Sequence, residues 1–374
     1  MTMDADTVNA CFAASYAEAR GKFLAAADAA GLDVQSHPHP LVGRDGEALA
    51  MDVARSGPAD AKALLIVSSA CHGIEGYCGS AVQNALLADA GFQRRARDAG
   101  VAVLYIHALN PWGFSWGRRT THENVDLNRN FHDFSRPLPE NPHYAELAHW
   151  LVPETWPPPP QAQAALLAFA AQQGERALQT AISSGQYTHP EGLFYGGQNP
   201  TWSQQTLRHV LQDHAQRCER LGWIDLHTGL GPTGHGERIF ACRDDAAALA
   251  RARAWWGDGV TSIYDGSSSS ALLVGLMWTV VDQECAQAEY TGIALEYGTV
   301  PLTEMIESLR AAQWLENHPE VGDTPQRREI EQRMRAAFYI ETDDWRERVV
   351  VQGREAADQA VAGLGGARPA PPRR

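Results

Sequence analysis

Residues 63–76 read ALLIVSSACHGIEG, an apolar run followed directly by a short polar motif. The run Ala63–Ser69 is short and apolar, which is typical of a strand buried on both faces. A second such run, Val101–Leu109, follows a stretch of helical character, Ser80–Ala99. A strand, a helix and a strand in this order predict a β-α-β unit. The fold class is therefore expected to be α/β, with a mixed, mostly parallel central sheet and helices on both faces.

The rest of the chain extends this pattern. We expect helices at about residues 8–30, 161–183 and 203–221 and in three stretches from 303 to 364, and strands at Trp223–His227, Ile239–Cys242 and Gly292–Tyr297. The proline-rich connector 153–160 could separate two domains, but candidate site residues fall on both sides of it. We therefore expect one domain over residues 1–364, with an insertion at about 132–222. The tail 365–374, rich in Pro and Arg, is expected to be disordered.

Composition excludes several kinds of partner. With 31 Lys and Arg against 45 Asp and Glu, the formal charge is −14, which argues against nucleic acid and anionic membranes. No stretch approaches the roughly 20 apolar residues of a membrane span. The start, MTMDADTVNACF, has neither a basic end nor a long apolar run, so no signal peptide is expected. Six cysteines without a Cys-x-x-Cys pair indicate reduced thiols and a cytoplasmic protein.

Two histidines and a glutamate are candidates for a metal site. His72 and Glu75 lie in a glycine-rich turn after the first strand, and His227 ends a later one. Parallel strands end at the same edge of a sheet, where α/β proteins bind ligands. Two imidazoles and a carboxylate make an open zinc site, with water as the fourth ligand. Since the chain has 14 histidines, the spacing could also arise by chance. A second such pair, in residues 143–146, is interpreted as a solvated helix face.

Residues 110–131 read NPWGFSWGRRTTHENVDLNRNF. This stretch resembles the zinc carboxypeptidase superfamily. In that family the first motif is His-x-x-Glu, a second zinc histidine ends a later strand, and a catalytic glutamate lies on a strand near the C-terminus. These elements occur here in the same order across roughly residues 60–300, with Glu296 in the stretch Leu295–Thr299 as the glutamate. Residues 192–197 and 225–231 resemble a bacterial branch labelled as a domain of unknown function.

The resemblance implies a metal centre with a proton carrier. His72, Glu75 and His227 would hold one Zn²⁺ per chain. Glu296 would activate the zinc-bound water and later protonate the leaving amine. Asp126 would orient the imidazole of His72, as carboxylates commonly do for zinc histidines.

The resemblance also implies a substrate site. Arg119 would polarise the scissile carbonyl, and Arg118 is a rival because the register of the Arg-Arg pair is ambiguous. Asn128 and Arg129 would bind a substrate carboxylate, Arg129 through a two-pronged contact. Three tyrosines are candidates for a residue that faces the substrate, namely Tyr195, Tyr264 and Tyr290.

Each role has a structural alternative. Glu296 could instead pair with a buried arginine, and Arg129 could belong to an ion pair that is only structural. Asp126, Asn128 and Asn130 could be turn formers that cap the local backbone. Cys71, beside the predicted ligand, could be a thiolate ligand, but a small buried residue is the better interpretation.

Two other motifs match catalytic patterns without the required context. Gly113–Gly117 matches Gly-x-Ser-x-Gly, but Pro111 interrupts the chain before it and no amphipathic helix follows. Gly229–Gly234 matches Gly-x-Gly-x-x-Gly, but a strand pattern follows it where a dinucleotide site needs a helix.

The expected function is that of a zinc-dependent, carboxypeptidase-like hydrolase. It would cleave an amide or peptide bond next to a carboxylate-bearing residue, in a small peptide or an N-acyl amino acid. An N-acyl-amino-acid deacylase similar to aspartoacylase, on the same scaffold, is the alternative. A binding module without catalysis is a third possibility, against which Glu296 argues, because a pure binder needs no base beside the metal.

Overall fold

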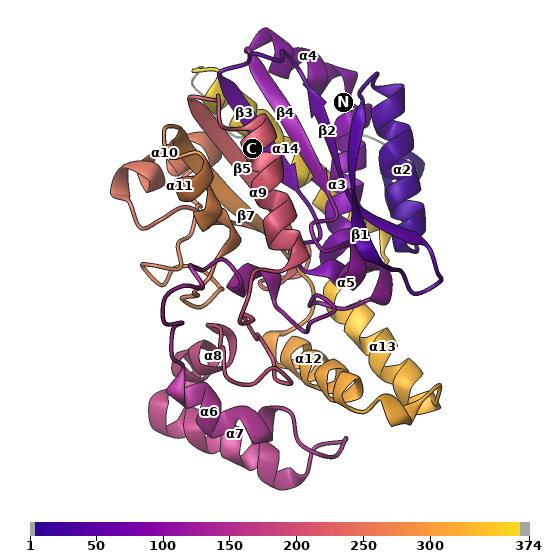
Figure 1. The fold of residues 1–374 in the computed structure, drawn as a ribbon, viewed down its shortest axis with the longest axis vertical. Coiled ribbons are helices and arrows are strands. Elements are labelled where there is room, and N and C mark those ends of the chain that lie inside the picture. The colour runs from indigo at the N-terminus through magenta and orange to yellow at the C-terminus, as the bar shows by residue number, and fades with distance from the viewer. Residues whose placement is uncertain (1–3, 367–374) are drawn as a thin grey trace.

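Seven strands form a single mixed sheet in the order β1-β2-β4-β3-β5-β7-β6 in the computed structural model, which describes residues 4–366 (Figure 1). The neighbours β4, β3, β5 and β7 are parallel, whereas β1, β2 and β6 are antiparallel to their neighbours. The bounds are β1 Val34–Val42, β2 Ala48–Ser56, β3 Ala63–Ser68, β4 Val101–His107, β5 Arg220–Gly229, β6 Gly236–Phe240 and β7 Glu289–Gly298. The predicted α/β class is confirmed.

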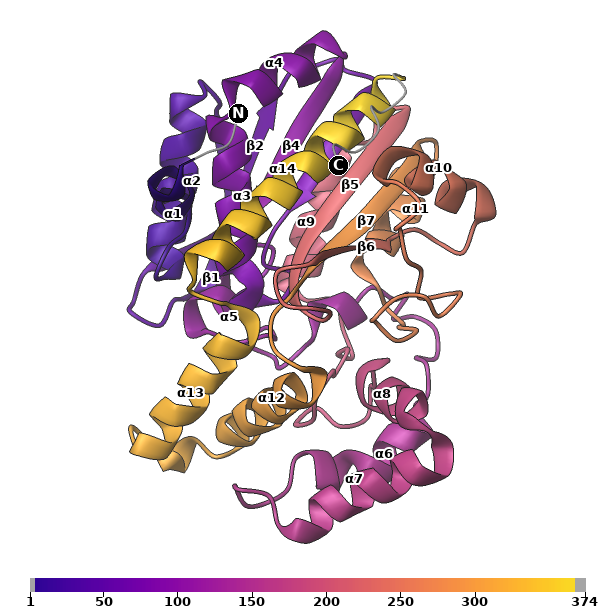
Figure 2. The ribbon, with the colours of Figure 1, turned by 180° about the vertical axis from the view of Figure 1, so that it is seen from behind.

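Helices cover both faces of this sheet (Figures 1 and 2). Alternate residues of β3 point to opposite faces. Leu65 and Val67 belong to the larger core. The helices that contribute side chains to this core are α1 (Ala5–Cys11), α2 (Tyr16–Ala29), α3 (Gly76–Ala88), α4 (Ala90–Asp98), α10 (Ala246–Trp256) and α14 (Asp343–Leu364). Leu64 and Ile66 belong to a second core, under α9 (Trp202–His214) and α11 (Val280–Glu284).

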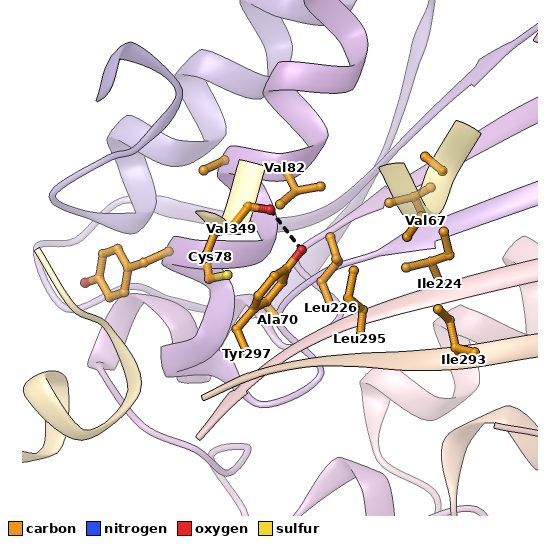
Figure 3. Packing of buried hydrophobic residues seen from close by; sticks show 14 of the residues in the cluster. Val67, Ala70, Cys78, Val82, Ile224, Leu226, Ile293, Leu295, Tyr297 and Val349 are labelled. Carbon is orange, nitrogen blue, oxygen red and sulfur yellow. Dashed lines mark hydrogen bonds between the residues drawn. The ribbon is translucent and has the colours of Figure 1, made fainter. Parts of the chain in front are cut away.

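The larger core packs α3 and α14 against the parallel strands (Figure 3). Val67, Ile224 and Ile293 lie next to one another on three neighbouring strands, and each is at most 1% exposed. Tyr297 donates a hydrogen bond from its hydroxyl to the carbonyl of Val349 (3.0 Å), which ties the end of β7 to α14. Full burial of such side chains contributes about 1.5–3 kcal/mol each, so this packing fixes the strand ends.

The remaining helices lie beyond the carboxyl ends of the parallel strands, below the sheet in Figure 1. They are α5 (Pro111–Trp116), α6 (Pro142–Leu151), α7 (Pro160–Gln173), α8 (Glu175–Ser183), α12 (Leu302–Asn317) and α13 (Pro325–Phe338). The range 132–222 thus contains four helices, and its status as an insertion in one domain stays a prediction. Most of the predicted tail, residues 367–374, lies outside the described residues.

Several predicted helices are interrupted. The helix expected at 80–99 ends at Ala88, and Asp89 caps a second helix by accepting from the backbone N–H groups of Gly91 and Phe92. The helix expected at 161–183 breaks at Gly174, whose φ is 96°. All six cysteines are free and buried. Within residues 4–366 no helix has the length and apolarity needed to cross a membrane.

Candidate metal centre

The candidate ligands meet where β3 and β5 end. His72 follows β3, Glu75 closes the short 3-10 turn Gly73–Glu75 before α3, and His227 lies near the end of β5. The turn needs glycine at position 73, because a Cβ there would lie 2.0 Å from the carbonyl carbon of Gly113. This close approach of α5 fixes the side chains on either side of Gly73.

Three ligand atoms converge at this point. His72 Nδ1 lies 2.8 Å from Glu75 Oε1, and His227 Nδ1 lies 3.0 Å from Glu75 Oε2. The two Nδ1 atoms are 3.3 Å apart. One ligand atom from each of the three residues falls within 4.8 Å of the others, and all three residues are buried. The structure therefore brings together the three residues that the sequence selected.

The far side of each imidazole faces a carboxylate. His227 Nε2 lies 2.5 Å from Asp225 Oδ2, and His72 Nε2 lies 3.2 Å from Asp126 Oδ1. An imidazole that donates its Nε2–H in this way presents a lone pair at Nδ1. When both imidazoles are neutral, their lone pairs and the Glu75 carboxylate converge, and a shared cation would relieve the repulsion among them. Two imidazoles and one carboxylate suit zinc, so these residues fit a metal ion.

The charges of the cluster reinforce one another. Burial alone would raise the pKa of Glu75, but the neighbouring His72 and His227 overcome this and hold the pKa well below its usual range. Burial alone would lower the pKa of His227, but Asp225 and Glu75 raise it well above its usual range. Burial also opposes ionisation of Asp126, yet Arg119 and Arg129 keep its pKa well below the ordinary value. Glu75 and Asp126 therefore remain ionised at neutral pH.

Glu296 lies beside this cluster on β7, directly opposite His227 in the parallel register. It is 9% exposed, and its Oε1 accepts a hydrogen bond from the backbone N–H of Leu230 (2.9 Å). Burial and the nearby charge of Glu75 raise the pKa of Glu296 to about 7. A carboxyl group with this pKa can both accept and release a proton near neutrality.

The structure places the two candidate arginines differently. Arg119 donates from Nε to Asp126 Oδ2 (3.0 Å) and from Nη1 to Glu75 Oε1 (3.2 Å). Its Nη2 lies 2.8 Å from His72 Nε2 and can donate there only when that nitrogen carries no proton, whereas the contact with Asp126 needs the proton. Arg118 turns away, pairs with Glu316 at 2.7 Å and lines a separate recess. Only Arg119 of this pair faces the ligand cluster.

Arg129 and Asn128 line the same recess as the ligand cluster. Arg129, 2% exposed, donates to the backbone carbonyls of Ser183 (2.7 and 3.1 Å) and Asn128 (2.7 Å). These bonds use three of its five N–H groups. Its nearest carboxylate, that of Asp126, is 4.0 Å away. The recess therefore contains a buried guanidinium with two N–H groups that these three hydrogen bonds do not use.

The recess between the sheet edge and helices α8 and α12 contains about 780 Å³ of space not filled by atoms, including space that is open to solvent. Its polar end contains the ligand cluster, Glu296 and the two arginines. Its remaining walls are mostly apolar and include Phe194, Leu230, Ile239, Ile263, Leu273, Trp278, Leu302, Met305 and Phe338. No tyrosine lines it within residues 4–366. Tyr195 contributes instead its backbone carbonyl, which accepts from the N–H of Asp126 (2.7 Å).

Sequence reasoning missed two residues of the site. Asp225 stands two positions before His227, so a strand places both on the same face; this spacing was the available signal. Phe194 carried no such signal, because nothing local marks which aromatic residue of the segment 193–195 faces a distant arginine. Cys71 forms a second possible ligand group with Asp225 and His227. Burial raises the pKa of its thiol well above the ordinary value, which supports the interpretation as a small buried residue.

The two decoy motifs lie outside this chemistry. Ser115 lies within α5, where its Oγ donates to Glu47 Oε1 (2.5 Å) and accepts from the backbone N–H of Arg44 (2.9 Å). Within the described part of the chain, its hydrogen-bond partners include no histidine. The glycine-rich segment 229–234 leads from β5 into β6 and not into a helix. Both observations agree with the sequence interpretation.

Comparison with known proteins gives a family and a set of similar folds. The family model described as "Protein of unknown function (DUF2817)" matches residues 12–352. No functionally curated protein matches this chain in sequence. Carboxypeptidase A from Helicoverpa armigera is 14% identical, with a TM-score of 0.42, over 86% of this chain and 73% of that one. A metallo-carboxypeptidase from Burkholderia cenocepacia is 12% identical, with a TM-score of 0.43, over 94% and 68%.

A third similar structure is thrombin activatable fibrinolysis inhibitor, which is 14% identical with a TM-score of 0.46 over 82% of this chain and 76% of that one. The predicted resemblance to carboxypeptidases and to a family labelled as of unknown function is confirmed as a likeness. At these identities and TM-scores, it carries no argument about the reaction or the substrate.

Proposed function

Because the chain belongs to the DUF2817 family, which is described only as one of unknown function, we propose its function from the site: a zinc-dependent hydrolase that cleaves an amide bond next to a carboxylate-bearing residue. The observation that carries the proposal is the convergence of His72, Glu75 and His227 within 4.8 Å. Glu296 and Arg129 line the same recess.

One Zn²⁺ per chain would be held by His72, Glu75 and His227. When bound, it supplies a Lewis acid that polarises a carbonyl and lowers the pKa of water. Asp126 and Asp225 hold the imidazoles in the tautomer that offers Nδ1 to the metal, which raises ligand basicity. Thr228 fixes the second oxygen of Glu75 by donating its backbone N–H at 3.1 Å.

Glu296 serves as the proton carrier of the reaction. Its buried carboxylate takes a proton from the attacking water and returns it to the leaving nitrogen. In the metal-free chain, burial and the charge of Glu75 raise its pKa to about 7, which suits transfer in both directions. The hydrogen bond from Leu230 N–H to Oε1 leaves Oε2 free to carry this proton. A binding module would have no use for a proton carrier at this position.

Arg119 supplies fixed positive charge at the reacting end of the recess. Its guanidinium stays protonated at neutral pH and acts only as a cation and donor, so it stabilises the oxyanion that develops on the substrate carbonyl. Arg118 is excluded from this role in the proposal, because its guanidinium pairs with Glu316 in the neighbouring recess.

Arg129 and Asn128 provide the carboxylate site. Two N–H groups of Arg129 remain after its three bonds to backbone carbonyls, and a carboxylate accepts such a pair in parallel. The Asn128 side chain is held by the N–H of Met277, which donates to Oδ1 (2.8 Å) and leaves the amide N–H₂ as a donor. A substrate carboxylate would also neutralise a buried cation, which favours an anionic substrate.

A substrate panel tests the proposal and separates its two forms. Small peptides with a free C-terminus, the same peptides amidated, and N-acyl amino acids are incubated with zinc-loaded protein. We expect turnover of free acids well above turnover of amides. Equal rates on amidated and free substrates would contradict the role of Arg129. Cleavage restricted to N-acyl amino acids would favour the deacylase over the carboxypeptidase.

A further inference from the structure

Phe194 lies where two recesses meet. It belongs to the segment between α8 and α9 and is 6% exposed. It lines the recess with the metal centre and also a second recess, of about 600 Å³, between residues 116–120 and helices α12 and α13. Among the residues that the structure describes, the two recesses share only Phe194 and Arg119. The ring is therefore part of the wall that divides them.

The ring contacts both arginines of the proposed site. The guanidinium carbon of Arg119 lies 5.2 Å from the ring centroid, and that of Arg129 lies 5.6 Å from it. Both distances fall within the range of about 6 Å in which a cation is attracted to an aromatic face. Two like charges thus face one ring, and the attraction of the ring for each of them offsets part of the repulsion between the two guanidiniums in this buried place.

The backbone at Phe194 adopts a conformation that bulky residues rarely adopt. Its φ is 53°, in the left-handed region that normally favours glycine. The surrounding chain holds it there: Gln186 N–H donates to the Phe194 carbonyl (3.2 Å), Asp126 N–H to that of Tyr195 (2.7 Å), and Asn130 Nδ2 to that of Gly196 (2.8 Å). Two of these three donors come from the segment that carries Arg129. Strain of this kind persists where the surroundings impose it, often at functional sites.

We propose that Phe194 is a positioning residue, whose ring holds the guanidiniums of Arg119 and Arg129 so that a substrate carbonyl and a substrate carboxylate meet both cations at once. This inference rests on the proposed function for its catalytic consequence, but the positioning itself is a property of the folded chain. It assigns a role in the site to the segment between α8 and α9.

The test compares two substitutions of equal backbone demand. Phe194→Leu removes the aromatic face, whereas Phe194→Tyr keeps it, and both keep a Cβ in the same left-handed conformation. Arginine Nε–H resonances are recorded on the zinc-loaded, ¹⁵N-arginine-labelled protein and are assigned from the signals lost in Arg119→Lys and Arg129→Lys. We expect Phe194→Leu to move both signals out of their ring-current-shifted positions and Phe194→Tyr to leave both near the wild-type positions.

Kinetics with N-benzoylglycyl-L-phenylalanine and its amide supply the second readout. Phe194→Leu is expected to lose about tenfold in kcat/KM for the free acid, the equivalent of one cation–aromatic contact of about 1.4 kcal/mol. This loss should appear mainly as a higher KM, and the preference for the free acid over the amide should become smaller. In Phe194→Tyr, kcat/KM for the free acid and the preference for acid over amide should both stay within about twofold of the wild-type values, by the same relation.

The two readouts separate failure of the inference from failure of the proposed function. Unmoved arginine signals in folded Phe194→Leu would overturn the positioning role, whatever the activity. An equal loss in Phe194→Leu and Phe194→Tyr would also overturn it, because the aromatic face would then be irrelevant. Moved signals in a protein whose wild type hydrolyses none of the panel would leave the positioning role intact and contradict the proposed function.

Discussion

Replacing Glu296 with Gln is expected to stabilise the metal-free protein at neutral pH. Burial and the charge of Glu75 raise the pKa of Glu296 from 4.5 to about 7. The folded chain therefore keeps a proton that the unfolded chain releases. The resulting cost in stability is absent below pH 4.5, grows as the pH rises, and is complete above about pH 7. At about 1.4 kcal/mol per pKa unit, the ionised carboxylate lowers the free energy of unfolding by about 3 kcal/mol.

Thermal unfolding of metal-depleted protein in a chelating buffer measures this cost. With an unfolding entropy of about 2.1 cal/mol/K per residue, Glu296→Gln should raise Tm by about 4 °C at pH 8 and by about 1 °C at pH 5. Glu237→Gln is the matched control, because Glu237 faces Glu296 across the β6–β7 register and is also buried. It accepts from Thr261 Oγ1 and from the N–H and Oγ of Ser269, so its loss should destabilise at both pH values.

The reasoning on Glu296 would be refuted by either of two results. The first is a Tm of Glu296→Gln at or below that of the wild type at pH 8. The second is an equal gain at pH 5 and pH 8, since a gain that does not depend on pH cannot come from ionisation of this carboxyl group.

Three further predictions concern the arginines and the carboxylates behind the imidazoles. Arg119→Ala should lower kcat by about 10²–10³. Arg118→Ala should change kcat by less than about threefold, since the pair of Arg118 with Glu316 lies in the other recess. A larger loss in Arg118→Ala than in Arg119→Ala, measured in steady-state assays, would exchange the two roles. Asp225→Asn should weaken zinc binding about 10–100-fold in competition with a chromogenic chelator, and unchanged affinity would show that Asp225 does not support His227. Arg129→Lys should raise KM for free-acid substrates with little change for amides, because a single ammonium cannot make the parallel contact; a selective fall in kcat would argue against carboxylate capture.

Much of this site could be predicted because parallel strands constrain where their ends meet. His72 follows β3, His227 lies near the end of the neighbouring parallel strand β5, and Glu296 lies on the next strand in register with His227. A residue assigned to the carboxyl end of a buried strand is thereby placed in space. The role of Asp126 beside His72 is predicted only by the family resemblance. In the structure, the loop that ends at Leu127–Arg129 brings Asp126 into contact with His72.

Other parts could not be predicted because they depend on long-range packing. The strand β1 (Val34–Val42) contains Pro38 and Pro40 and mostly exposed side chains, so it shows no strand signal; proline is tolerated there because β1 is an edge strand. The choice between Arg118 and Arg119 depends on Glu316, far along the chain. The role proposed for Phe194 likewise depends on two arginines that come close only after folding.

The metal content of the purified protein tests the central claim most directly. Protein is purified without added metal, incubated with excess Zn²⁺, desalted and analysed by elemental mass spectrometry beside His72→Ala. The account predicts about one zinc per wild-type chain, the single open site of two imidazoles and one carboxylate, and a small fraction of that in His72→Ala. Wild-type zinc well below one per chain, or equal zinc in His72→Ala, would contradict it.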